Sequence, residues 1–331
     1  MKSKATWCLF LGLAIICALF VWQGAGNVAA ILADGGWALL LVCLFAPTDQ
    51  LMGAEAYRRL FRASVRPPVF ATWMASWMGS AVNTLLPVAT IGGEVVKARM
   101  LVLGGTNGEP AVAAMIVDKT VQAIVVLLWA LAGIAMLAWL TDDRAVISGA
   151  LFGAAGLAIG ISGFVWVQVK GGTSFLARTA DTAGRNIGGG KWRGVVDKAE
   201  AVDEEIRVTY RRPAALTLAS ALRLSARIIL IGEVMLAAHL MGYPITIMEA
   251  LMLKGLATGI RGVAFAIPGG LGVQEGGYIA VGALIGLPPE LMLAVSLTTR
   301  VREIVPNIPF LLYWQFAEGR HQWRKARSEN L

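Results

Sequence analysis

Long apolar runs separated by short polar segments dominate the chain, and most runs approach the length of a membrane-spanning helix. A bilayer crossing takes about 20 mostly apolar residues in a helix, so the pattern predicts an all-α, polytopic integral membrane protein. Pro306 and Pro309 interrupt the last run, and we expect the helix to break there. The runs cover residues 5–22, 36–56, 69–86, 88–103, 111–140, 145–169, 214–241, 247–267, 276–287 and 290–316.

One sizeable polar segment, residues 170–212, divides the apolar sequence. It predicts a cytoplasmic loop between two membrane halves, 1–169 and 213–331. Its first part is rich in glycine and indicates a flexible connection, whereas residues 192–210 have the spacing of an amphipathic helix. The polar face of that helix is more acidic than basic, which is the wrong sign for binding anionic lipid. We therefore expect its apolar face to dock on the rest of the protein. That face carries Val195, Ala199, Val202, Ile206 and Thr209.

Composition agrees with a membrane protein, because 57% of the 331 residues are hydrophobic and only 15% are charged. An ordinary soluble domain has about 25% charged residues. These values exclude a disordered chain, a small disulfide scaffold and a nucleic-acid-binding module, and they argue strongly against a soluble enzyme. The net charge of +8 is explained by Lys and Arg retained in cytoplasmic loops, so no nucleic-acid partner is expected.

Neither the cysteines nor the N-terminus suggests a different class of protein. Cys8, Cys17 and Cys43 all lie in apolar runs, which argues against a disulfide framework or a zinc site. We expect no metal and no cofactor. The first run, 5–22, has the position of a signal peptide, but its length and the weak cleavage site in 24–30 favour an uncleaved first span.

The basic residues predict how the chain is oriented. Of the 29 Lys and Arg residues, 21 lie in the N-terminus, the segments 57–68, 97–110 and 170–212, and the C-terminal tail, while the loops on the opposite side hold only Arg144. This asymmetry places both termini in the cytoplasm. The segments 69–103 and 247–287 then become helical hairpins that enter the membrane from opposite sides. The short second arms favour re-entrant hairpins, although full spans remain possible.

The two hairpins can be aligned without a gap by a shift of 181 residues. The match brings together proline and glycine breakers as well as charges at membrane depth, with the two copies in opposite orientation. These features describe an inverted repeat, which is a common plan of membrane transporters; the alternative is chance similarity between two glycine-rich apolar stretches. The matched pairs are Pro87 with Pro268, Glu94 with Glu275, Leu103 with Leu284, Gly105 with Gly286, Glu109 with Glu290, Ala113 with Ala294, and Lys119 with Arg300.

Several charged residues lie within apolar runs, where a charge that faces lipid costs about 2.5–3.5 kcal/mol. Most of them must therefore face the protein interior or a hydrated cavity, either paired or holding a ligand. Arg223 is close enough to the cytoplasmic end to snorkel, whereas Arg227 is deeper and shares a helix face with Arg223, an arrangement that favours binding an anion. The basic members of the set are Lys119, Arg223, Arg227, Lys254, Arg261, Arg300 and Arg302.

Two carboxylates, Glu94 and Glu275, lie just beyond the tips of the predicted hairpins. Each would meet the positive N-terminus of a second arm, so helix capping alone explains them. The alternatives are contact with a polar headgroup or a proton-carrying site. Asn83 precedes the first tip, where unwound backbone needs hydrogen-bond partners. Arg302 and Glu303 have a simpler interpretation as a packing pair between helices.

The segments Asn83–Pro87, Gly92–Arg99 and Pro268–Gly277 resemble the flippase-like transmembrane family named for the membrane region of lysylphosphatidylglycerol synthase. Length and the proline-bearing last span are similar to its hopanoid-biosynthesis-associated subfamily. The resemblance implies movement of a lipid, a hopanoid or a phospholipid, between leaflets of a bacterial inner membrane, with both hairpins lining the lipid site. Together with the charge pattern it gives the candidate lipid-binding or transport residues Asn83, Pro87, Glu94, Arg99, Lys119, Arg227, Arg261, Pro268, Gly269, Gly270, Glu275 and Arg300.

Three functions remain open from the sequence. The first is a lipid transporter that works by alternating access at the hairpins. The second is a membrane-embedded lipid-modifying transferase, for which the sequence offers neither an Asp-rich motif nor a placed histidine. The sequence ends 15 residues after its last predicted span, which also counts against the soluble transferase domain of the bifunctional relatives. The third is a non-catalytic subunit that recruits lipid-biosynthesis enzymes through residues 170–212.

Overall fold

A computed structural model describes residues 25–86, 92–140, 144–174, 193–263 and 271–329, and every regular element in these ranges is helical. The all-α prediction is confirmed. The elements are α2 (Ala25–Gly35), the 3-10 helix η1 (Gly36–Leu44), α3 (Phe45–Leu60), the 3-10 turn η2 (Ala63–Val65), α4 (Val69–Leu85), α5 (Gly92–Leu103), α6 (Gly108–Leu140), α7 (Arg144–Val169), α9 (Arg193–Tyr210), α10 (Pro213–Leu240), α11 (Ile247–Val263), α12 (Val273–Leu284), α13 (Pro289–Ile304) and α14 (Asn307–Glu329).

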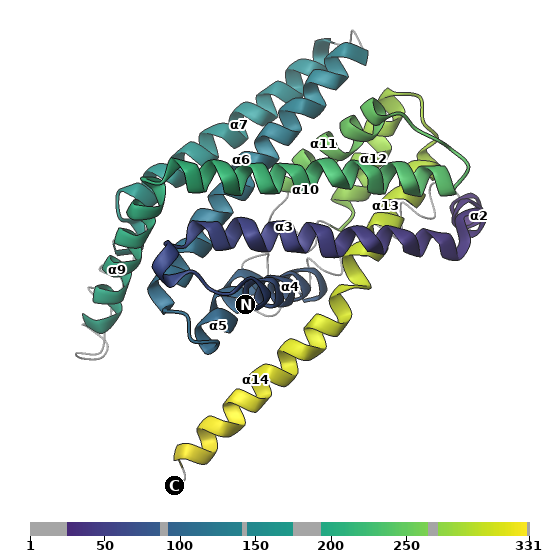
Figure 1. Ribbon diagram of the computed structural model, residues 1–331. Coiled ribbons are helices and arrows are strands. Elements are labelled where there is room, and N and C mark those ends of the chain that lie inside the picture. Colours follow the sequence, from purple (N-terminus) through teal and green to yellow (C-terminus); the bar gives the residue numbers. More distant parts are fainter. Residues whose placement is uncertain (1–24, 87–91, 141–143, 175–192, 264–270, 330–331) are drawn as a thin grey trace, which may run out of the picture.

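Four helical stretches in the described ranges are long and apolar enough to cross a membrane: Gly26–Leu60, Gly108–Trp139, Ile147–Val169 and Pro213–Leu240. The first of them comprises α2, η1 and α3, and α2 lies at an angle to α3 (Figure 1). A chain with four such helices is a multi-pass membrane protein. The first apolar run of the sequence, 5–22, lies outside the described residues.

The last apolar run forms two helices rather than one broken span. α13 ends at Ile304 and α14 begins at Asn307, so the break falls at Pro306 as expected. The expected break at Pro309 is wrong, because this proline lies in the first turn of α14, where the missing N–H has no intrahelical partner to lose. α14 then continues to Glu329, through a tail whose Ala, Arg, Lys, Gln and Glu residues are good helix formers.

Figure 1 shows α3 and α10 side by side across the centre of the bundle. The α4–α5 pair packs on one flank of α3, and the start of α14 lies against α4 before that helix leaves the bundle. α6 packs along α11, which is followed by α12 and α13. The long central helices therefore hold the two short-helix pairs, α4–α5 and α11–α12, around a common interior.

Glycines allow close backbone approach at two helix contacts, α4 with α5 and α6 with α11. A Cβ atom at Gly79 of α4 would lie 2.5 Å from the carbonyl oxygen of Gly93 in α5. Asn83 strengthens the same contact, since its Oδ1 accepts a hydrogen bond of 2.8 Å from the Gly93 N–H. At the contact between α6 and α11, a Cβ atom at Gly255 of α11 would lie 3.0 Å from the carbonyl oxygen of Trp129 in α6. Small residues are the usual means of packing helices where lipid removes the hydrophobic driving force.

The two segments matched in the sequence have the same local structure after their short helices. α5 ends at Leu103 and α12 ends at Leu284, which are equivalent positions under the shift of 181 residues. Each helix stops at a glycine with positive φ, 93° at Gly105 and 74° at Gly286, the left-handed conformation that commonly ends a helix. The next helices, α6 and α13, also begin at equivalent positions. The segments thus form a structural repeat, while their opposite orientation and re-entrant course stay predictions.

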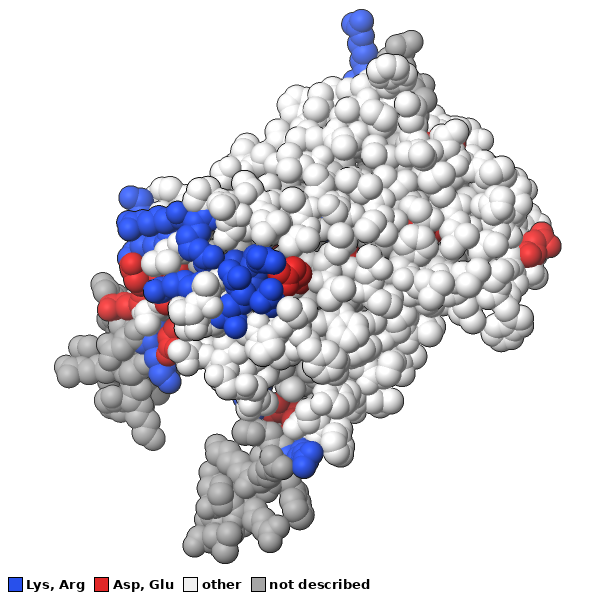
Figure 2. All heavy atoms as spheres, viewed as in Figure 1, with Lys and Arg blue, Asp and Glu red and all other residues white. Residues whose placement is uncertain are grey.

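Charged side chains are unevenly distributed on the molecular surface. Figure 2 shows Lys, Arg, Asp and Glu gathered at the end where α3 stops and α9 meets α10, while most of the remaining visible surface is uncharged. The arginines at this end are Arg58, Arg59, Arg62, Arg66, Arg211 and Arg212.

The helix expected in the polar segment is α9, and its apolar side lies against α6. Val202 and Ile206 are buried in a hydrophobic cluster that also contains Val117 and Val121 of α6. At the end of α9, the Tyr210 hydroxyl donates to Gln168 Oε1 of α7 at 2.8 Å. The segment is therefore packed on the helical bundle.

We expect Gly79→Val to lower the free energy of unfolding by about 1–3 kcal/mol, the usual cost of forcing extra atoms into a tight contact. The new side chain would collide with the α5 backbone at Gly93. Gly153→Val in α7 is the matched control, because nothing lies within 4 Å of its Cβ position. Thermal or denaturant unfolding of the purified protein in detergent measures both, and equal stability of the two variants would refute the close contact.

Candidate functional site

A polar cavity of about 540 Å³ lies between the helices, with lining residues from both short-helix pairs and from α3, α6, α10 and α13. The volume is within the range of about 300–1,000 Å³ that is typical of small-molecule sites. A cavity lined by charges is unusual within apolar helices, and it indicates a ligand or a hydrated path. Its charged lining comprises Asp49, Glu94, Lys97, Lys119, Arg223, Arg227, Lys254, Arg261, Arg302 and Glu303.

The first ion-pair network joins α5, α6 and α10. Glu94 pairs with Lys97 at 2.6 Å and with Lys119 at 2.7 Å. Lys97 also reaches Asp118 at 2.9 Å, and the fully buried Asp118 carboxylate receives the guanidinium of Arg223 with N–O distances of 2.6–3.0 Å. Buried charges are tolerated when each has a partner and hydrogen bonds. All of these residues except Asp118 line the cavity, so the network lets three helices place four charges there.

Aromatic contact completes the surroundings of Lys97. Its ammonium group lies 4.2 Å from the centroid of the Tyr57 ring, which is a cation–π geometry. The Tyr57 hydroxyl donates to the carbonyl oxygen of Ala111 at 2.9 Å. Tyr57 therefore connects the C-terminal half of α3 to both α5 and α6.

The second network centres on Glu233 of α10, whose side chain is fully buried. Its two oxygens bind Lys254 of α11 at 2.9 Å and Arg302 of α13 at 2.6 Å. Arg302 also approaches Asp49 of α3 at 3.8 Å. One carboxylate thus ties three helices together.

A third group surrounds Glu303, which also belongs to α13. Glu303 pairs with Arg261 of α11 at 2.7 Å and with Arg300 at 3.4 Å. Arg300 in turn binds Glu275 of α12 at 2.8 Å, and Glu275 accepts a hydrogen bond of 2.8 Å from the Gly272 N–H. The capping interpretation of Glu275 is therefore confirmed, and the same carboxylate also holds a buried arginine.

Equivalent ion pairs occur in the two halves of the repeat. Glu94 binds Lys119, and the matched residues Glu275 and Arg300 bind each other, at 2.7 and 2.8 Å. In both cases the carboxylate lies on the short second helix and the basic group on the helix that follows. The spacing of charges found in the sequence therefore corresponds to one repeated contact.

The structure places the predicted site residues in three different surroundings. Asn83, Glu94, Lys119, Arg227 and Arg261 line the cavity. Glu275 and Arg300 are buried and connect to it through Glu303. Arg99 is exposed, outside the cavity lining, and pairs with Glu318 of α14 at 2.6 Å. The candidates Pro87, Pro268, Gly269 and Gly270 lie outside the described residues.

Several cavity residues were not selected from the sequence. Arg223 was expected to snorkel toward the cytoplasm, but it turns inward because Asp118 offers a buried carboxylate. Arg302 and Glu303 were interpreted as a packing pair between helices, and they do contact other helices: Arg302 binds Glu233 of α10, and Glu303 binds Arg261 of α11. Their position in apolar runs was the available signal. Which charge meets which depends on helix packing, and a single sequence does not contain that information.

Comparison with known proteins gives one match. A family model described as "Lysylphosphatidylglycerol synthase TM region" matches residues 9–309. Neither the curated proteins nor the solved structures contain a match. The family match covers the described helices from α2 to the start of α14, and with them the whole cavity lining.

Glu233→Gln should lower the free energy of unfolding by about 3–5 kcal/mol, since it leaves Lys254 and Arg302 buried without their counter-charge. Glu205→Gln is the control. It breaks the exposed pair between Arg62 and Glu205 and should cost about 0–1 kcal/mol. Unfolding of both variants in detergent is the measurement, and similar losses would show that the Glu233 pairs do not stabilise the bundle.

Proposed function

Since the chain belongs to the lysylphosphatidylglycerol synthase TM-region family, we propose that it is a lipid transporter that moves a membrane lipid between leaflets. The observation that carries the proposal is the charged cavity between the two repeated helix pairs. A headgroup would enter this cavity, while the acyl or polycyclic part of the lipid stays among the apolar outer surfaces of the helices. The lipid is a hopanoid or a phospholipid.

The proposed mechanism is alternating access at the two hairpins, α4–α5 and α11–α12. Each second helix is fastened to its neighbour by one equivalent ion pair, Glu94–Lys119 or Glu275–Arg300. Exchange of such a pair for contacts with the headgroup would release one hairpin while the other stays closed. Inverted hairpins that enter from opposite sides would then open the cavity to one leaflet at a time.

Surface charge supports an orientation for this cycle. The arginine-rich end at the junction of α3, α9 and α10 (Figure 2) would face the cytoplasm of a bacterial inner membrane. Both termini would then be cytoplasmic. In this proposal the protein is a transporter and not a transferase, because most of the charged residues that converge on the cavity form ion pairs between helices.

Reconstitution in liposomes tests the function directly. We expect the wild type to move fluorescent phospholipid or a hopanoid analogue across the bilayer, and Glu94→Gln and Glu275→Gln each to slow the movement at least about 10-fold, the effect of about 1.4 kcal/mol on a barrier. Each change removes one of the equivalent ion pairs. Glu205→Gln, in an exposed pair, should move lipid at the wild-type rate.

Absence of movement by correctly folded wild type, with and without a proton gradient, would contradict the proposal. It would favour a subunit that recruits lipid-biosynthesis enzymes through residues 170–212. Retained movement after both glutamate substitutions would contradict the hairpin mechanism but not lipid transport itself.

A further inference from the structure

The charges around the cavity do not balance. Counting the lining and the buried residues paired with it, eight basic side chains face six carboxylates among the described residues, an excess of two positive charges. Uncompensated charge within a membrane bundle is costly, so the excess favours binding of an anion. The basic groups are Lys97, Lys119, Arg223, Arg227, Lys254, Arg261, Arg300 and Arg302, and the acidic groups are Asp49, Glu94, Asp118, Glu233, Glu275 and Glu303.

The excess is concentrated at Arg227. Within the described part of the chain this guanidinium has no hydrogen bond and no ion pair within 4.0 Å, whereas Arg223, one turn earlier on α10, is bound to Asp118. The charged cavity residues that act most strongly on Arg227 are three arginines, Arg223, Arg261 and Arg302, and one carboxylate, Asp49. Such surroundings favour a negative ligand at Arg227.

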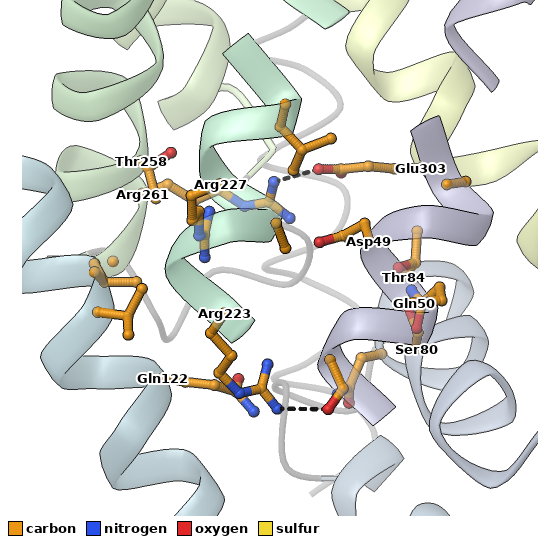
Figure 3. A pocket seen from close by; sticks show the side chains of 18 of the residues that line it. Asp49, Gln50, Ser80, Thr84, Gln122, Arg223, Arg227, Thr258, Arg261 and Glu303 are labelled. Carbon is orange, nitrogen blue, oxygen red and sulfur yellow. Dashed lines mark hydrogen bonds and ion pairs between the residues drawn. The ribbon is translucent and has the colours of Figure 1, made fainter. Parts of the chain in front are cut away.

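Figure 3 shows how the cavity is arranged around this position. Arg227 and Arg261 lie near each other, with Thr258 one turn from Arg261 on α11, while Asp49 lies on the facing wall. All four line the cavity. Arg261 binds Glu303 and Gln274 through the same nitrogen, Nη1, each at 2.7 Å, so its other two nitrogens and the Arg227 fork can accept a ligand in the cavity.

We propose that Arg227, with Arg261 and Thr258, binds the phosphate of a lipid headgroup. The planar guanidinium fork matches phosphate oxygens in pairs, and a phosphate diester or monoester would neutralise one or both of the excess charges. A lipid whose headgroup carries only hydroxyl groups would leave the two excess positive charges of the cavity uncompensated. The inference rests on the proposed function, and it chooses phosphate-bearing lipids over neutral ones as the class that enters the cavity.

Binding to the full-length protein in detergent tests the inference without requiring transport. The probes are dihexanoyl phosphatidylglycerol, dihexanoyl phosphatidic acid, dihexanoylglycerol as the neutral lipid, and inorganic phosphate. The rise in unfolding temperature with probe concentration gives an apparent Kd. We expect both phospholipids to stabilise the wild type, and the neutral lipid and inorganic phosphate at the same concentrations to have little effect.

Substitution of Arg227 gives the decisive comparison. Arg227→Gln should weaken phospholipid binding at least about 10-fold, the expected loss when a charge-assisted hydrogen-bonded pair is removed. Arg227→Lys keeps the charge without the fork and should bind with intermediate affinity. Arg144→Gln, at the exposed first residue of α7, should bind as the wild type does. Without ligand, Arg227→Gln should unfold at the wild-type temperature or higher, because it removes an uncompensated charge.

Three results of the probe comparison would overturn the inference. They are unchanged phospholipid binding by Arg227→Gln, equal stabilisation by the neutral lipid, and equal stabilisation by inorganic phosphate, which would assign the site to the free anion. A lower unfolding temperature of ligand-free Arg227→Gln, with Arg227→Lys binding no better, would also overturn it by showing a structural role. Phospholipid binding without transbilayer movement would support this inference and contradict transport, so the two failures are distinguishable.

Discussion

Compensation of charge inside an apolar bundle is the constraint on which the rest of this structure depends. Asp118 and Glu233 are fully buried, and each binds two basic side chains from different helices. A helix that shifts must therefore exchange a partner rather than simply lose one, since an unpaired charge at this depth is costly. The buried charges therefore help the apolar contacts to fix the packing of α5, α6, α10, α11 and α13.

The sequence predicted the positions and ends of helices well, because these depend on nearby residues. The apolar runs correspond to helices, Gly105 and Gly286 follow the ends of α5 and α12, and Pro306 lies between α13 and α14. The sequence analysis ended the last helix near residue 316, because the residues that follow are charged. α14 continues to Glu329 because those charged residues have good helix propensity. Local pattern and structure agree because the backbone must satisfy its hydrogen bonds within each helix when no water is present.

The candidate site was predictable only in part, because residue type and position do not determine pairing. Glu94, Lys119 and Arg227 were selected as membrane-depth charges, and they do line the cavity. Arg99 is an arginine like Arg227 and lies five residues from Glu94 in the sequence. Its side chain is nevertheless exposed and pairs with Glu318 of α14. Five residues along a helix change the face by more than a third of a turn, and the sequence alone did not establish which face meets the interior.

The Gly79–Gly93 contact and the Asn83 hydrogen bond have a mechanical consequence. They join α4 and α5 backbone to backbone, which favours movement of the two helices as one unit. On another side of α4, the Trp77 ring is stacked on the Phe310 ring of α14, with centroids 4.0 Å apart. Stacked aromatic faces can slide past each other without breaking a directional bond, whereas separation of α4 from α5 would break the Asn83 hydrogen bond.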